Sequence, residues 1–411
     1  MSTIETSQAT LSGCWKEIAS SFLKIGMMAY GGPAIMGIMQ AELQEKRQWL
    51  SKERFVEGLS VVNMLPGAGA TQLGIFLGYT RAGWWGGLLA GLCFVLPAFF
   101  IMLALTLVYA TFGNTPLLRG ALYGLGPVVL GIFAVAVYRL GRNAITGPAQ
   151  VLIVLAAAAA IITSPLGIAM VLAIAGALGI FLFHSRRIGL AVLAALAVLQ
   201  LALYFVPVYF GAPAYFGGGT TVASAQGSAG LLDIGAFFLK VGALTFGGGL
   251  TMIAFIQEQV VNQFHWLTPR EFVDGLALGQ FAPGPILMVA AYVGYKLAGI
   301  AGAIVAGAAI FLPSFILMLS ILPVYERVRK LQWIKAAIKG IGPAVIGTLT
   351  VSLVQMAPHA VPDSYAAILF VCAVVTLLWW RAGAIRVMLG GALFGLLKDR
   401  ITSLPGLRAI F

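Results

Sequence analysis

Charged side chains are scarce in this sequence of 411 residues. Lys, Arg, Asp and Glu make up 9% of it, whereas about a quarter of the residues of a soluble globular protein are charged. Hydrophobic residues account for 60%. This balance excludes a water-soluble globular domain, because such a domain needs polar and charged side chains over its surface. The lipid bilayer is therefore the predicted environment of most of the chain.

Cysteine and histidine are few and scattered. The three cysteines, Cys14, Cys93 and Cys372, form no paired motif, so neither a disulfide framework nor a metal site is supported. The motifs H-E-x-x-H, G-x-S-x-G and G-x-x-x-x-G-K-[ST] are also absent. A zinc metalloprotease, a serine hydrolase and an ATP-driven pump therefore lack support in the sequence. We therefore expect a protein that is not an enzyme and that has no cofactor.

Acidic residues are about half as numerous as basic ones, since 13 Asp and Glu stand against 25 Lys and Arg. A basic balance can indicate nucleic acid, but no soluble segment here is large enough to carry a basic face. The excess is instead typical of the cytoplasmic loops of membrane proteins. We therefore expect no nucleic-acid partner.

Long apolar runs predict membrane-spanning helices. Residues 84–112 and 188–210 exceed the ~20 residues that a helix needs to cross the hydrocarbon. The predicted spans are 18–40, 55–79, 84–112, 118–139, 150–163, 166–183, 188–210, 231–256, 272–295, 298–322, 333–357, 365–380 and 384–397. This layout of six, one and six spans predicts an all-α integral membrane protein whose last six spans have the opposite orientation to the first six.

The sequence also repeats itself. The pattern Phe-Leu-Lys-x-Gly at residues 22–26 recurs at 238–242, which is 216 positions later. Further matches at nearly the same offset are Trp49 with Trp266, Pro66 with Pro283, Gly78 with Gly294, Pro97 with Pro313 and Pro127 with Pro343. We predict a first repeat at 14–187, a linking helix with an external loop at 188–230, and a second, inverted repeat at 231–411. Inverted repeats place a substrate site near the bilayer midplane, at the repeat interface.

Basic loops predict the orientation of these spans. In this count the basic stretches 139–142, 186–187, 327–330 and 381–386 share one side, which the positive-inside rule makes the cytoplasm. The basic stretches 46–54 and 398–408 fall on the other side. The side on which the N-terminus lies is therefore left open.

Each repeat contains two breaks in its apolar helices. The first is the glycine pair Gly31 and Gly32, repeated as Gly247 and Gly248. The second is Pro66-Gly67, repeated as Pro283-Gly284, in helices whose starts are marked by Ser51 and Thr268. Helix breaks release backbone N–H groups, which in a membrane must bind protein, water or a ligand. A freed helix N-terminus favours an anion, although close helix packing or a simple kink is the alternative.

Polar and charged side chains accompany the breaks. Amides occur three residues before each proline, at Asn63 and Gln280, and Thr71 and Gln72 follow the first break. These amides bind either a ligand oxygen or the freed backbone. Lys24 and Lys240, seven residues before Gly31 and Gly247, are candidates for neutralising an anion, with snorkelling to the membrane interface as the alternative.

Two carboxylates are also paired by the repeat. Glu57 and Asp274 each lie about one turn into the helix that precedes the second break. A carboxylate inside apolar sequence either carries protons or forms an ion pair. Both interpretations of Glu57 and Asp274 remain open at this point.

These motifs resemble those of the chromate ion transporter family in its long, two-domain form. The residues that carry the resemblance are 22–26, Gly31-Gly32-Pro33, Pro66-Gly67, 245–248 and 281–285, and the match covers nearly the whole chain. It implies a multi-pass protein of the bacterial inner membrane that exports chromate and confers resistance to it, with sulfate as a structural analogue. The repeats differ at Ala68, whose counterpart is Pro285, so the two half-sites need not be equivalent.

Export of an oxyanion fits the energetics of an inside-negative membrane. Moving two negative charges outward through ~100 mV releases roughly 4.6 kcal/mol, so ATP is not required. A carrier of sulfate or another oxyanion would share every feature above. A non-transporting membrane sensor would need a soluble domain or a catalytic constellation, which the sequence lacks. The coupling ion and a homo-oligomeric state are left open.

Overall fold

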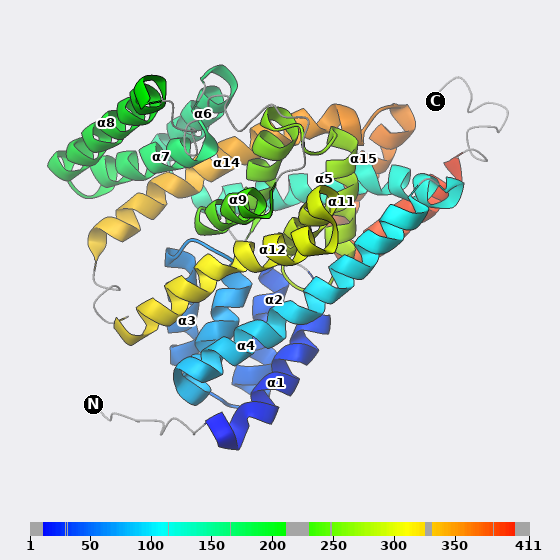
Figure 1. Ribbon diagram of the computed structural model, residues 1–411, viewed down its shortest axis with the longest axis horizontal. Coiled ribbons are helices and arrows are strands. Elements are labelled where there is room, and N and C mark those ends of the chain that lie inside the picture. The colour runs from blue at the N-terminus through cyan, green and yellow to red at the C-terminus, as the bar shows by residue number, and fades with distance from the viewer. Residues whose placement is uncertain are drawn as a thin grey trace. The chain divides into compact units, whose positions relative to one another are not determined.

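The computed structural model describes residues 11–28, 30, 32–113, 115–164, 166–210, 230–246, 249–324, 331–380 and 382–398. Every secondary-structure element in these ranges is helical (Figure 1). Within them, four helical segments are long and apolar enough to cross a membrane: α4 (Gly69–Phe112), α5 (Pro116–Ala144), residues 286–321 and α14 (Gln332–Ala360). The prediction of an all-α membrane protein is thereby confirmed.

The helices follow the predicted apolar runs. The first half also contains α1 (Leu11–Met28), α2 (Gly32–Met39), the π-helix η1 (Gln40–Lys46), α3 (Lys52–Met64), α6 (Pro148–Thr163), α7 (Ile168–Phe183) and α8 (Arg186–Phe210). The second half also contains α9 (Leu231–Ala243), α10 (Leu250–Phe255), the π-helix η2 (Ile256–Gln263), α11 (Pro269–Phe281), the 3-10 helix η3 (Ile286–Met288), α12 (Val289–Ile321), the 3-10 helix η4 (Leu322–Val324), α15 (Ser364–Leu378) and α16 (Ala384–Leu396). The predicted span 18–40 is therefore divided into α1 and α2, and the span 55–79 into α3 and the start of α4.

Helix caps form at the predicted starts of α3 and α11. The Ser51 hydroxyl accepts a hydrogen bond from the Arg54 N–H at 3.2 Å. At α11 the Thr268 hydroxyl accepts from the Glu271 N–H at 3.2 Å, and the Glu271 carboxylate accepts from the Thr268 N–H at 2.9 Å. This reciprocal capping box fixes where the chain enters the helix that leads to the second break.

One long helix in each half turns back on itself. In α4 the helix is interrupted at Ala82 (φ −145°, ψ 33°) and Gly83 (φ 62°, ψ −154°). In α12 the same interruption occurs at Ala298 (φ −144°, ψ 31°) and Gly299 (φ 60°, ψ −148°). These are corresponding positions of the two halves, and their backbone angles agree to within a few degrees.

Glycine pairs show that each interruption is a tight hairpin. A Cβ added at Gly78 would collide with the carbonyl of Gly86, and one added at Gly294 would collide with the carbonyl of Gly302. Residues eight apart in one straight helix would be separated by about 12 Å along its axis. The two limbs of each hairpin therefore run side by side, with glycines allowing the close approach.

The described residues form two compact contact units, and each takes segments from both halves of the chain. The first contact unit lies within 1–107, 229–249 and 278–330, and the second within 108–228, 250–277 and 331–411. The first contact unit therefore holds α1, α3, most of α4, α9 and α12. The second holds α5 to α8, α10, most of α11 and α14 to α16.

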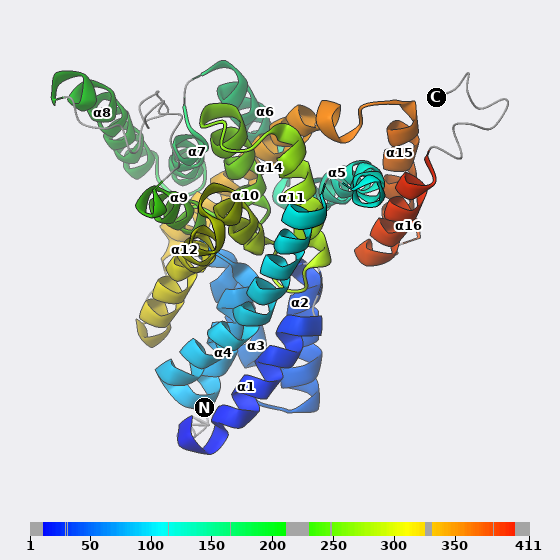
Figure 2. The ribbon, with the colours of Figure 1, turned by 45° about the vertical axis from the view of Figure 1, so that its right-hand side comes forward.

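In the second contact unit, helices from one half of the chain pack against helices from the other half. Helix α5 packs against α15 and α16, whereas α14 packs against α6 and α7 (Figures 1 and 2). A Cβ added at Gly124 would lie 2.7 Å from the Cα of Gly395, and one added at Gly340 would lie 2.9 Å from the Cα of Gly179. Gly340 and Gly395 are 216 residues after Gly124 and Gly179, so the two contacts are each other's counterparts with the halves interchanged.

Candidate functional site

The first helix break, between α3 and α4, is held by backbone and side-chain hydrogen bonds within the first contact unit. The Gly67 N–H donates to the Thr245 carbonyl at 2.6 Å, and the Ala68 N–H donates to the Ser314 hydroxyl at 2.7 Å. The Pro66 carbonyl accepts from Nε2 of Gln72 at 2.6 Å. The polar backbone groups of Pro66, Gly67 and Ala68 in these bonds are thus satisfied by protein, and two of the three partners belong to the second half of the chain.

Glycine is required at the centre of this break. Gly67 has φ +124°, a conformation that side-chain-bearing residues rarely adopt. A Cβ there would also lie 2.5 Å from the Ser314 hydroxyl and 2.6 Å from Nε2 of Gln72. A larger residue at position 67 would therefore displace the hydrogen bonds that hold the break.

The second break, between α11 and η3, occupies the matching place in the same contact unit. Gly284 has φ +93°, and a Cβ on it would lie 2.8 Å from the Ala98 Cβ and 3.7 Å from the Gly26 carbonyl. Ala98 and Ser314 are 216 residues apart and each follows a helical proline. The first break therefore contacts the second-half helix just after Pro313, and the second break contacts the first-half helix just after Pro97.

The two breaks differ in one coupled pair of residues. Ala68 has an N–H to donate and meets the hydroxyl of Ser314, whereas its counterpart Pro285 has no N–H and the residue in the place of Ser314 is Ala98. A hydroxyl is present where a donor needs it and absent where no donor exists. At this pair of positions the first break is therefore held by a hydrogen bond, and the second break faces the apolar Ala98.

The glycine pairs are only partly within the described residues. Gly31, Gly247 and Gly248 lie outside them, and Gly32 is the first residue of α2. Thr245, two residues before Gly247, accepts the hydrogen bond from Gly67. A Cβ added at Gly249 would meet the side chain of Leu287, just after the second break. The first proline–glycine break thus contacts Thr245, just before the second glycine pair, and the residue just after that pair, Gly249, lies beside Leu287 near the second break.

The predicted amides and lysines are less enclosed than the breaks. Asn63 on α3 is exposed and Gln280 on α11 is half-buried. Lys24 on α1 is exposed, whereas Lys240 on α9 is half-buried. Of the two lysines that the sequence pairs, Lys240 is therefore the one that burial favours as a partner for an anion inside the protein.

Both predicted carboxylates form ion pairs with an arginine of their own helix. Glu57 accepts from Nη1 of Arg54 at 2.8 Å and remains partly exposed. Asp274 is buried, lies 3.4 Å from Nε of Arg270 and accepts from the Tyr109 hydroxyl at 3.0 Å. The ion-pair interpretation accounts for these contacts, and Tyr109 is a partner that the sequence did not reveal.

Sequence reasoning missed the two residues of the second half that hold the first break. Ser314 and Thr245 are fully buried. Ser314 is a hydroxyl directly after Pro313 within an apolar helix, which is the signal that could have marked it. Thr245 acts through its backbone carbonyl, which every residue type has, so its identity as threonine could not have revealed this role.

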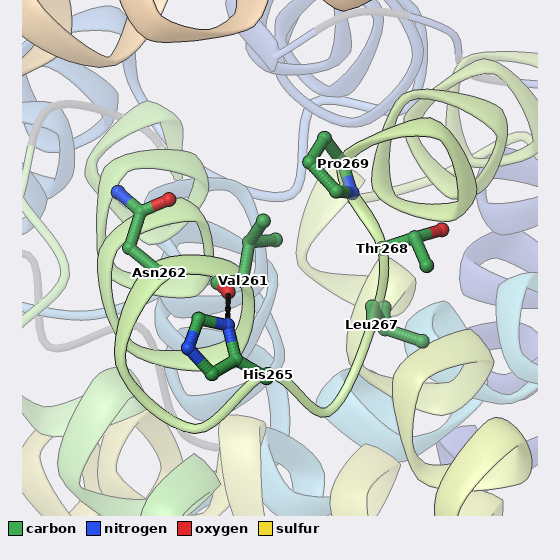
Figure 3. A pocket seen from close by; sticks show the side chains of 6 residues that line it. All are labelled: Val261, Asn262, His265, Leu267, Thr268 and Pro269. Atoms are coloured by element: carbon green, nitrogen blue, oxygen red, sulfur yellow. Dashed lines mark hydrogen bonds between the residues drawn. The ribbon is translucent and has the colours of Figure 1, made fainter.

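A hollow of about 410 Å³ lies in the second contact unit. Its lining comes from the end of η2, the turn that follows and the first residue of α11 (Figure 3): Val261, Asn262, His265, Leu267, Thr268 and Pro269. His265 is exposed, and its Nδ1 lies 2.9 Å from the Val261 carbonyl. The hollow contains none of the predicted site residues.

Comparison with known proteins finds relatives over nearly the full chain. The family model described as chromate transporter matches twice, at residues 16–180 and at 232–396. The chain is 32% identical to a chromate transport protein of Cupriavidus metallidurans, over 93% of this chain and 92% of that one. It is 33% identical to a chromate transport protein of Pseudomonas aeruginosa, over 85% and 83%. No solved structure matches this chain.

Replacing Ser314 by alanine tests the anchoring of the first break. The substitution leaves the buried Ala68 N–H without its acceptor, which should cost about 1–3 kcal/mol of folding free energy. Unfolding of the detergent-solubilised protein measures this loss. Ser60→Ala, which removes an exposed hydroxyl bonded to the Val56 carbonyl at 2.9 Å, should change stability by less than about 0.5 kcal/mol. Equal unfolding of both variants would contradict the assigned role.

Proposed function

This chain belongs to the chromate transporter family, and we propose on that premise that it exports chromate from the cytoplasm of a bacterium across the inner membrane. Cells that contain it thereby become resistant to chromate. The observation that carries the proposal is that the family model matches both halves of the chain, and that the helices are broken at corresponding places in both matched regions. Discontinuous helices in repeated halves are typical of transporter binding sites.

The packing of the first contact unit supports a single substrate site. The break at Gly67 is bonded to Thr245, and the break at Gly284 lies against Gly26, so each break meets a segment that leads toward a glycine pair. We propose that the oxyanion binds among these breaks. The residues of this site are Lys24, Gly31, Gly32, Asn63, Pro66, Gly67, Lys240, Gly247, Gly248, Gln280, Pro283 and Gly284.

The exchange of packing partners supports a two-fold relation between the halves. Contacts such as Gly124 with Gly395 and Gly340 with Gly179 are interchanged by the repeat, as a two-fold axis requires. Helix α8 stands between the matched regions 16–180 and 232–396. An odd linking span reverses the direction of the spans after it, so we propose that the second repeat is inverted relative to the first.

The membrane potential supplies the driving force. Each negative charge that moves outward through ~100 mV releases ~2.3 kcal/mol, which corresponds to roughly a 50-fold concentration ratio. Exchange for another ion can add to this. In this proposal Glu57 and Asp274 carry no protons. They neutralise Arg54 on α3 and Arg270 on α11, with which they form ion pairs.

Chromate accumulation in whole cells tests the proposed function. Cells that express the protein should hold less chromate than cells without it, and the difference should vanish when the potential is dissipated. Excess sulfate tests the competing assignment, because a sulfate carrier would lose its effect on chromate when sulfate is abundant. Equal chromate contents with and without the protein, at normal expression, would refute chromate export.

Lys240 provides a test of charge compensation. Lys240→Gln should lower the export rate about tenfold, since losing ~1.4 kcal/mol of charge attraction has that effect, whereas Lys240→Arg should retain part of it. Lys24→Gln should have a smaller effect because Lys24 is exposed. Lys335→Gln, at an exposed position on α14, is the control. Normal export by Lys240→Gln would assign this lysine to snorkelling instead.

A further inference from the structure

Thr71 differs from several other threonines of the chain in what its hydroxyl does. In five of them the hydroxyl donates to a backbone carbonyl three or four residues earlier: Thr80 to Leu77, Thr106 to Met102, Thr245 to Val241, Thr348 to Val345 and Thr350 to Ile346. Thr71 is fully buried, and its Oγ1 has no partner among the described residues. Its position explains why. It lies in the first turn of α4, where no helical turn precedes it.

Gln72, the next residue, contributes an acceptor in a fixed orientation. Its Nε2 donates to the Pro66 carbonyl at 2.6 Å. Because a carbonyl can only accept, this bond determines which end of the amide is nitrogen and which is oxygen. The other end, Oε1, is fully buried and has no partner among the described residues. Gln72 therefore presents a carbonyl oxygen that needs a hydrogen-bond donor.

These two groups stand at a helix N-terminus that favours negative charge. The first N–H groups of α4 have no acceptor within their own helix, and the helix dipole places partial positive charge there. Unpartnered buried polar groups are rare in native proteins and are unfavourable in a membrane, where water cannot replace the missing partner. A ligand that fits this place must accept a bond from Thr71, carry negative charge and donate a bond to Gln72.

The second half of the chain has no equivalent of this pair. The residues that follow the second break at the matching positions are Leu287, Met288 and Val289. All three are buried and apolar. At these matching positions, buried polar side chains directly after a break therefore occur in the first half alone.

We propose that Thr71 and Gln72 bind a monoprotonated tetrahedral oxyanion, with the Thr71 hydroxyl donating to an unprotonated oxygen and Oε1 of Gln72 accepting from the oxyanion's O–H. This inference rests on the proposed function and specifies which form of the substrate is carried. Chromate takes up a proton close to neutral pH, whereas sulfate does so only in strong acid. The pair thus selects hydrogen chromate over sulfate, which has no proton to donate to Gln72.

The proposal changes the charge that moves in each cycle. Hydrogen chromate carries one negative charge, so one charge and one proton leave with each chromium atom. A fully ionised chromate would carry two charges and no proton. The dianion assumed from the sequence is thereby replaced by a monoanion, and the number of charges per cycle becomes a measurable consequence.

Purified protein in proteoliposomes, with chromate as the probe, tests the binding pair. Thr71→Val keeps the shape of the side chain but removes the hydroxyl, and should lower chromate transport at least about tenfold. Thr71→Ser should retain transport to within about twofold. The matched control is Thr80→Val on the same helix, whose hydroxyl is already bonded to the Leu77 carbonyl at 2.8 Å, and it should transport normally. Normal transport by Thr71→Val would overturn the proposal.

The charge per cycle tests the carried form without any variant. With equal pH on both sides and an imposed potential of about 100 mV, one charge gives a final chromate ratio of about 50-fold, and two charges give about 2,500-fold. The initial rate at limiting total chromate should also fall as the pH is raised above neutrality. A two-charge ratio or a rate independent of pH would overturn the proposal while leaving chromate transport established. Absence of chromate movement at every pH would instead refute the proposed function, and this inference with it.

Discussion

Satisfying the backbone at a broken helix is the constraint on which the first contact unit depends. Lipid offers no hydrogen bonds, so every N–H released by a break must find a partner in the protein or in a ligand. The break at Gly67 meets this requirement with Thr245 and Ser314, both from the other half of the chain. The two halves are therefore joined by the groups that make the break possible.

The same interdependence recurs in the second contact unit through glycine. Helix α5 of the first half packs closely on α16 of the second, and α14 of the second packs closely on α7 of the first. Without a strong hydrophobic force between helices in lipid, such close backbone approach supplies the packing energy. Each contact unit is thus built from both halves, although each half carries its own complete set of breaks and hairpins.

The sequence predicted the local features well because they depend on neighbouring residues. The helices, the breaks after Met64 and Phe281, and the capping box at Thr268 follow from apolar runs and from Gly, Pro and Thr at fixed positions. Contacts between distant residues were not predictable in this way. Three features depend on how distant segments pack: the role of Ser314, the pairing of helices from different halves, and the difference in exposure between Lys24 and Lys240. The spacing of residues along one sequence does not reveal such packing.

The contact between Ala68 and Ser314 is the most direct point at which to test the interlocking of the two halves. With Cys14, Cys93 and Cys372 replaced, Ala68→Cys and Ser314→Cys should form a disulfide on mild oxidation. A protease site placed within residues 211–229 then reveals whether the disulfide has formed. After cleavage, a crosslinked chain still runs at full length on a denaturing gel without reductant. The pair Ala68→Cys with Ser320→Cys, on an exposed position further along α12, should separate into two fragments. Separation of the first pair as well would contradict the docking of the first break on the second half of the chain.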